Sequence, residues 1–118
     1  MYVRLKIGSS FQIGDVVSFD SSSQSWVSAQ DLSKLVGVIN SQPTQYEGDD
    51  FHTAELVFSG IVQAKASRDV AVEGGLMAVE SGGVYVSATD PHCGAIAPQI
   101  YSDSSVRPAG SLVMVHLR

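Results

Sequence analysis

The sequence predicts an all-β protein with a small, barrel-like domain made of two similar halves. Apolar and polar residues alternate in short segments such as residues 2–7, which is the period of half-buried strands. Clusters of glycine, serine and aspartate separate these segments and favour turns. Segments of the first half also recur in the second half, at spacings of 56 to 60 residues. Two halves of under about 60 residues, each too small to bury its own apolar face well, would stack around a pseudo-twofold axis.

Five pairs of segments define the repeat. They are Val3 and Lys6 with Val62 and Lys65, residues 14–20 with 74–80, 27–29 with 86–88, 37–39 with 94–96, and 56–57 with 112–113. We therefore expect an internal duplication of two halves of roughly 58 residues within a single β domain over residues 1–118, with pseudo-repeats at about 1–60 and 61–118. Chance recurrence of valine and glycine in a β protein is the alternative.

The first half consists of strand candidates joined by polar turns. The expected strands cover residues 2–7, 16–19, 26–29 and 37–40. Leu32, Leu35 and Val36 lie at helical spacing behind Asp31 as a cap, which predicts about one turn of helix over 31–36. The polar stretch 41–52 is the longest loop candidate of this half.

The second half follows the same course. The expected strands cover residues 54–64, 76–79, 84–87, 95–97 and 112–117. The first of them bends at Gly60, where a bulge or corner would fit. The last is a nearly unbroken apolar run, which is typical of a strand covered on both faces. One face of residues 112–117 is therefore expected in the core and the other at a subunit contact.

Composition and charge limit the partners. The chain has 118 residues and a mass of 12.5 kDa, with 7 Lys and Arg against 12 Asp and Glu. The formal charge of −5 repels the phosphate backbone, so no nucleic acid partner is expected. Cys93 is the only cysteine, which rules out an intrachain disulfide and fits a reducing cell interior. No signal-like N-terminus and no apolar run of membrane-spanning length is present, so no membrane partner is expected.

The sequence offers no convincing catalytic or metal centre. The histidines are His52, His92 and His116, and no two of them share a ligand spacing. The segment 90–93 places an acid, a base and a thiol side by side, but its proline indicates a turn, and catalytic Cys–His partners normally come from distant positions. We therefore expect no enzyme, no cofactor and no metal. A small hydrolase or self-cleaving domain on a β scaffold stays open as an alternative.

The order of these segments resembles that of a class of phage protein. The segments are Val17-Ser18-Phe19-Asp20 through Trp26-Val27, then Leu35-Val36-Gly37-Val38-Ile39, then Leu56-Val57-Phe58-Ser59-Gly60-Ile61-Val62. An aspartate-ended strand, a tryptophan-containing return, a VGI-like strand and a strand ending in Ser-Gly make the chain similar to the β-tulip head-decoration, or capsid cement, proteins of tailed bacteriophages. Continued to 112–115, the segments are also similar to the β-rich C-terminal modules of phage tail fibres.

The resemblance covers most of the chain from about Ile13 and implies a function without chemistry. It implies a virion structural protein of β-tulip fold that binds the major capsid protein on the assembled phage head and stabilises the head by bridging capsomers. It also implies a homo-oligomer, by analogy a trimer, on the capsid surface of the virion, made in the host cytoplasm. The alternative is a tail-fibre or baseplate module for receptor binding or tail assembly. Decoration proteins often carry a long N-terminal arm, whereas the strand pattern here starts at Tyr2.

Two groups of residues are candidates for the contacts that this function needs. The capsid-contact candidates are the stripe Tyr2, Arg4 and Lys6, which could pair with a neighbouring strand edge, and Tyr46 and Phe51, two aromatics amid acids. The oligomer-interface candidates are Leu112, Met114, Val115 and His116 in the apolar run near the end of the chain. Burial of both faces of that run in the core is the alternative for the second group.

Overall fold

A computed structural model of the protein describes residues 2–6, 10–48, 51–87, 94–97 and 106–117. These residues form an all-β fold and contain no helix, which confirms the expected fold class. The strands of the first half are β1 (Tyr2–Lys6), β2 (Val16–Asp20), β3 (Ser25–Ser28), β4 (Val36–Ile39) and β5 (Phe51–Val57). Those of the second half are β6 (Gly60–Lys65), β7 (Val70–Ala71), β8 (Gly75–Glu80), β9 (Gly83–Val86), β10 (Gly94–Ile96), β11 (Val106–Arg107) and β12 (Leu112–Leu117).

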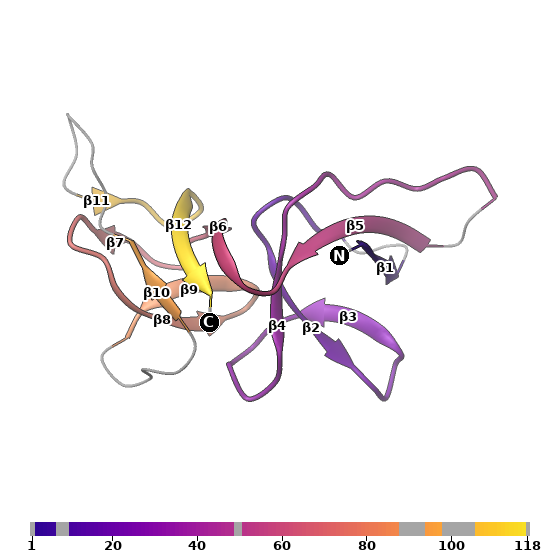
Figure 1. Cartoon of the computed structure of the whole chain (residues 1–118), viewed down its shortest axis with the longest axis horizontal. Helices are drawn as coiled ribbons and strands as arrows, with labels where there is room; N and C mark the ends of the chain where they lie inside the picture. The colour runs from indigo at the N-terminus through magenta and orange to yellow at the C-terminus, as the bar shows by residue number, and fades with distance from the viewer. Residues whose placement is uncertain (1, 7–9, 49–50, 88–93, 98–105, 118) are drawn as a thin grey trace.

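Each half forms its own five-stranded antiparallel sheet, and the two sheets share one strand order. The first sheet has the order β1-β5-β4-β2-β3 and the second the order β6-β12-β10-β8-β9, while β7 and β11 form a separate pair. The edge strands of each sheet approach one another, so that each sheet curls toward a barrel. Figure 1 shows the two curled sheets side by side along the long axis. With β6, β8, β9, β10 and β12 as counterparts of β1 to β5, the two orders are identical, as an internal repeat predicts.

Strand register shows which residues correspond. Val16 lies opposite Val38 and Leu76 opposite Ala95, in agreement with the expected match of 37–39 with 94–96. Further on, Ile39 lies opposite Leu56, whereas Ile96 lies opposite Val115. By the same pairing Arg4, and not Lys6, corresponds to Lys65, so the expected match of Val3 and Lys6 with Val62 and Lys65 is wrong. Ser28 corresponds to Val86, so the expected match of 27–29 with 86–88 is one residue out of register. Leu56 corresponds to Val115, and the expected match of 56–57 with 112–113 is wrong as well. A shared Leu-Val pair suggested that match, but cross-strand pairing and not local identity fixes the register of a strand.

Both sheets bury the same face. The first half encloses an apolar cluster of Leu5, Val17, Ile39, Ala54 and Leu56, flanked by Phe11, Trp26 and Phe58. The counterparts of the five cluster residues in the second half are Ala66, Met77, Ile96, Val113 and Val115, and all of them are buried in the larger core cluster. The repeated pattern therefore places equivalent side chains inside each curled sheet.

The first sheet also buries part of its outer face against the second half. Val16 and Val38 have an exposed fraction of 0%, and together with Ala29 and Val36 they join the core cluster of the second half. Strand β4 is accordingly buried at every residue. The core cluster of the second half thus extends onto the outer face of the first sheet, while the first half keeps its own cluster on the inner face.

Backbone hydrogen bonds fasten the segment Gly14–Val16 of the first half to two places in the second. The Lys65 amide donates to the Gly14 oxygen at 2.8 Å, and the Val16 amide donates to the Gly82 oxygen at 2.9 Å. The Lys65 ammonium adds an ion pair with Asp15 at 3.3 Å. Among the described residues no such bond joins the counterparts Gly74 or Leu76 to the first half. The contact is not reciprocal, so the expected pseudo-twofold stacking is wrong.

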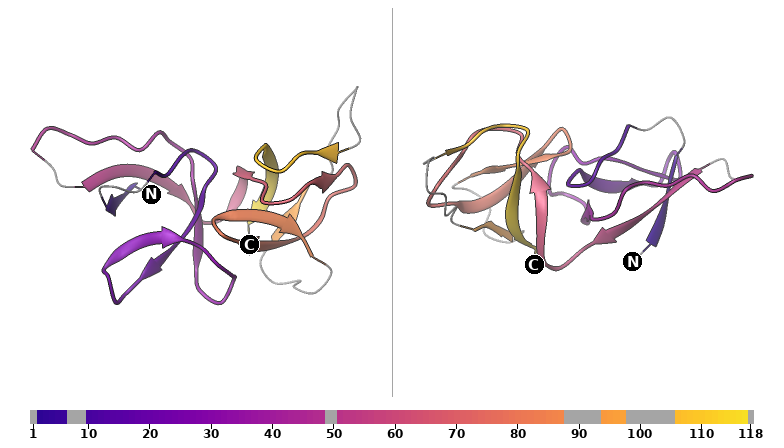
Figure 2. Two further views of the ribbon diagram at one scale, coloured as in Figure 1. Left: turned by 180° about the vertical axis from the view of Figure 1, so that it is seen from behind. Right: turned by 90° about the horizontal axis from the view of Figure 1, so that it is seen from above.

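Gly60 lies where the chain passes from one half to the other. The expected bend in residues 54–64 is confirmed, because Phe58 and Ser59 separate β5 of the first sheet from β6 of the second. Gly60 has a φ of +88°, which a glycine adopts without strain. Figure 2 shows the two sheets diverging on either side of this junction.

Two local expectations are corrected. Residues 31–36 form no helical turn, because the Asp31 carboxylate accepts a hydrogen bond from the Ser33 amide at 2.8 Å, in a bend that competes with a helix. Within the expected loop 41–52, Thr44 pairs with Thr53 through two backbone hydrogen bonds. Strand β5 therefore extends beyond the residues that pair with β4, and with the segment around Thr44 it forms a long arm. That arm projects at one end of the molecule in Figure 1.

Candidate interaction surfaces

Strand β12, which carries the four oligomer-interface candidates, alternates between the core and solvent. Val113, Val115 and Leu117 point into the second sheet and are buried. Met114 is 40% exposed, His116 is exposed and Leu112 is half-buried. One face of residues 112–117 is therefore in the core, as expected, and the alternative that both faces lie in the core is wrong; the subunit contact on the outer face stays a prediction. Val115 belongs to the core, so only Leu112, Met114 and His116 offer side chains to a partner.

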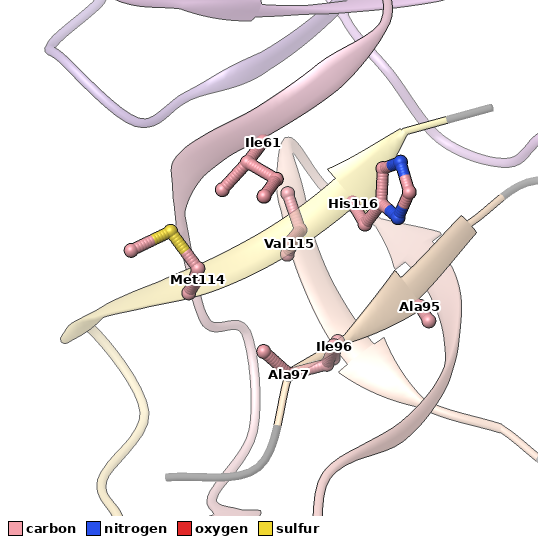
Figure 3. Close-up of a pocket in the computed structure, with 7 residues that line it drawn as sticks. All are labelled: Ile61, Ala95, Ile96, Ala97, Met114, Val115 and His116. Carbon is pink, nitrogen blue, oxygen red and sulfur yellow. The ribbon is translucent and has the colours of Figure 1, made fainter. Parts of the chain in front are cut away.

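The outer face of the second sheet around β12 is apolar and hollowed. A pocket of about 280 Å³ lies there, lined by Ile61, Ala95, Ile96, Ala97, Met114, Val115 and His116. Ile61 of β6 lies opposite His116 in the register and is 69% exposed, an unusual position for a large aliphatic side chain. Figure 3 shows Ile61, Met114 and His116 projecting from neighbouring strands around this hollow. Sequence reasoning missed Ile61, although its alternation with buried Val62 was a usable signal.

The capsid-contact candidates gather around β5. Tyr2, Arg4 and Lys6 lie in β1, opposite Glu55, Thr53 and Phe51 respectively. The side chains of Tyr2, Arg4 and Lys6 lie outside the described part of the structure, whereas Phe51 is half-buried. Tyr46 is 59% exposed on the arm that follows Thr44, along the other edge of β5. The fold therefore brings the strand 2–6 and Phe51 together and places Tyr46 across β5 from them.

An aromatic cluster that the sequence analysis did not single out lies on the first sheet. Phe19 and Trp26 are cross-strand neighbours with ring centroids 5.5 Å apart, and Phe58 lies 5.8 Å from Trp26. Phe19 is 41% exposed, so the cluster reaches the surface. The signal was the position of Phe19 and Trp26 at equal distances from the hairpin turn, which predicts that they pair.

A charged group links the β6–β7 connection to the β8–β9 hairpin. The Arg68 guanidinium donates to both carboxylate oxygens of Glu80, at 2.6 and 2.8 Å, and lies 4.0 Å from the centroid of the Tyr85 ring. The Arg68 hydrogen bonds lower the pKa of the Glu80 carboxyl below its usual value. Asp20, the counterpart of Glu80, instead accepts hydrogen bonds from the hydroxyls of Ser23 and Ser22, which lower its pKa. Both acids thus stabilise hairpin ends and stay ionised near neutral pH.

The described ranges contain no group of three His, Cys, Asp or Glu side chains that could hold a metal ion. His52 and His116 lie in different sheets. The segment 90–93, with His92 and Cys93, lies outside the described residues. Nor does any helix in the described part of the chain have the length and apolar character needed to cross a membrane.

The fold and these surfaces define an all-β protein that presents an open apolar sheet face. Comparisons of the chain with protein-family models, with curated proteins and with solved structures gave no match.

Proposed function

We propose that the protein is a virion structural protein of a tailed bacteriophage, a capsid decoration protein of β-tulip type that binds the assembled head and bridges its capsomers. The observation that supports this function best is the open apolar face around Ile61 and Met114, which is suited to burial against another protein. The shared strand order of the halves supports the internal duplication that forms part of the proposal.

The proposed mechanism is binding without chemistry and without a cofactor. Copies of the chain, in a trimer, contact one another and the major capsid protein on the outer surface of the virion. Apolar area buried at such contacts stabilises the assembled state by roughly 25 cal/mol per Å² and contributes nothing to separate subunits. Decoration therefore opposes rupture of the head, because a ligand that binds only one state shifts the equilibrium toward that state.

Two regions would contact the shell. One is strand β1, an edge strand of its sheet, and the other is the arm that carries Tyr46 and ends at Phe51. An edge strand offers backbone groups for pairing, and exposed aromatics are frequent anchors of protein interfaces. The half-exposed face of β12 is left for contacts between copies.

The test is co-sedimentation with undecorated heads assembled from the major capsid protein that the same genome encodes. The wild-type protein should pellet with the heads to a saturating occupancy. The double variant Tyr46→Ala with Phe51→Ala and the charge reversal Lys6→Glu should each lower that occupancy while the protein stays folded. Point changes are preferable to deletion of residues 1–6, since Leu5 is 1% exposed in the core and β1 pairs along its whole length.

Leu35→Ala is the matched control, because Leu35 is 68% exposed and lies on neither region. Wild-type protein that stays in the supernatant with heads would contradict the decoration function. Binding to purified tails but not to heads would support the tail-fibre or baseplate alternative. Wild-type occupancy for both variants would show that the shell contact lies on other residues.

A further inference from the structure

The first sheet packs on the second half through part of its outer face. The equivalent part of the second sheet is open. Val16 and Val38 have an exposed fraction of 0% in that contact. Their counterparts by register are Leu76 and Ala95, which are only half-buried on the outer face of the second sheet. The same part of the repeat is therefore covered in the first half and open in the second.

The part of the second half on which the first sheet packs also has an equivalent in the first half. Inside the chain, Lys65 of β6 and Gly82 of the β8–β9 turn receive the segment Gly14–Val16. By register the counterpart of Lys65 is Arg4, which keeps the basic residue type, and the counterpart of the β8–β9 turn is the β2–β3 turn. Residues 21–24 of that turn are all exposed. Strand β1 is an edge strand of its sheet, so the first half has a receiving edge of the same kind.

We infer that two copies of this chain associate head to tail, with the outer face of the second sheet of one copy docked on the β1 edge and β2–β3 turn of the first sheet of another. The contact between copies repeats the contact between the halves of each copy. It rests on the proposed function for the expectation of an oligomer, but it does not require shell binding. Because the neighbouring copy would cover the β1 edge, the arm with Tyr46 and Phe51 is left as the shell contact of the assembled ring.

The properties of both surfaces fit this occupant. Ile61 and Met114, 69% and 40% exposed, flank His116, whose counterpart Val57 packs on the core cluster of the second half. The repeated contact would therefore reach this part of the donor face and the pocket beside it. On the receiving side, Phe19 is 41% exposed in the strand that leads into the turn. Repeats that cannot bury their faces alone gain stability by stacking on a neighbour, and this chain contains only one such stacking contact.

The symmetry of the assembly follows from the contact. Because the two docked surfaces differ, the interface is heterologous, and copies close into a ring when the rotation between them permits. A ring of three copies is the expected form, in keeping with the proposed trimer. An isologous dimer, in which one surface meets its own copy, is excluded by this arrangement.

Cysteine cross-linking distinguishes these arrangements. Within the chain, a side chain at Gly82 would place its Cβ 3.4 Å from the Cβ of Ser28, close to the separation in a disulfide. The counterparts of these two positions are the β2–β3 turn and Val86, which is 40% exposed. We therefore introduce Ser22→Cys into one batch of full-length Cys93→Ser protein and Val86→Cys into another. On oxidation, the mixture should form a disulfide-linked dimer, whereas each batch alone should not.

A second measurement tests the donor face directly. Ile61→Asp should reduce the mass measured by light scattering from that of an oligomer to that of one chain. Leu35→Asp, at 68% against 69% exposure, is the matched control and should keep the wild-type mass. Cross-linking within either batch alone, a wild-type protein of single-chain mass, or an Ile61→Asp protein of wild-type mass would each overturn the head-to-tail contact.

The two proposals fail separately. A wild-type oligomer that forms the mixed disulfide but does not pellet with heads would contradict decoration and support the contact between copies. A monomeric wild-type protein that pellets with heads would support decoration and overturn the contact.

Discussion

At the scale of single residues, main-chain atoms lie close to Gly74 on the side where a Cβ would project. Its φ is +67°, and a Cβ there would lie 2.9 Å from the Ala97 oxygen and well inside van der Waals distance of the Ile96 oxygen. Both neighbours are main-chain atoms at the end of β10, so neither can rotate away. The turn at Gly74 therefore sets how closely β8 approaches β10.

We expect Gly74→Ala to destabilise the protein by about 3 kcal/mol, the sum of strain at a positive φ and overpacking against backbone. Gly60→Ala is the control, since Gly60 has a φ of +88° but nothing within 4 Å of its Cβ position. The control should cost only about 1–2 kcal/mol, the strain contribution alone. Urea unfolding of both variants measures the difference, and equal losses would show that the close approach of Ile96 and Ala97 does not exist in solution.

At the scale of elements, β12 and β4 show what an apolar run can predict. The run 112–117 was expected to have one face in the core and the other at a subunit contact, and within the single chain its outer face is open. Strand β4, only four residues long, is the strand buried at every residue. Both contain consecutive apolar residues, so the pattern indicates the potential for double coverage. Which strand is covered on its second face depends on how the two halves pack, and a local sequence pattern does not contain that information.

The alternation along β12 makes a sharp prediction for two neighbouring positions. Val115→Asp should unfold the protein, because a charge at a site with 0% exposure costs more than about 4 kcal/mol. Met114→Asp, at 40% exposure, should change the free energy of unfolding by less than about 1 kcal/mol and should weaken self-association. Circular dichroism and light scattering measure the two effects. Equal stability of the two variants would contradict the assignment of core and outer faces.

The hairpin β2–β3 and the segment 31–36 show where a local sequence pattern predicts the structure correctly and where it does not. The return arm at Trp26 was predicted from the polar turn before it, and the hairpin is confirmed. The helical turn was predicted from the spacing of Leu32, Leu35 and Val36, but Val36 is buried as the first residue of strand β4 and Leu35 is 68% exposed. Leu32 alone is left to hold a helical turn on the core, which is too little to offset an Asx bend at Asp31.

At the scale of the whole molecule, the core cluster that includes residues of both halves should make the halves unfold together. Val38 of the first sheet lies among residues of the second half, so loss of either half exposes it. We expect one cooperative transition in urea, with coincident midpoints from Trp26 fluorescence, which reports the first half, and from far-ultraviolet circular dichroism.

Val38→Ala should lower both midpoints together, with a loss of about 2 kcal/mol. Val27→Ala is the control, since Val27 is 36% exposed on β3, and it should change stability by about 0.5 kcal/mol or less. Separate transitions for the two signals, or a change in only one of them with Val38→Ala, would show that the halves are independent.

That the two halves share one strand order was accessible to sequence reasoning, but the order itself and the contact between the halves were not. The glycine-punctuated segments predicted a repeat, and the two sheets do have one strand order. A twofold axis was the simplest way to stack two equal halves. The observed contact instead engages Val16 in one half and Gly82 in the other, and these positions are not equivalent in the repeat. The asymmetry of this contact depends on tertiary packing, and the periodicity of the sequence gives no information about it.

The ends of the described chain lie beside the junction between the halves. Leu117 is opposite Gly60 in the register, and Tyr2 is opposite Glu55, two residues before the end of β5. A peptide or fluorescent protein fused to either end would therefore lie near the junction between the halves and crowd the space between the two sheets. The exposed residues 33–35, between β3 and β4, lie on neither region proposed to contact the shell, and they are the better insertion point for displayed cargo.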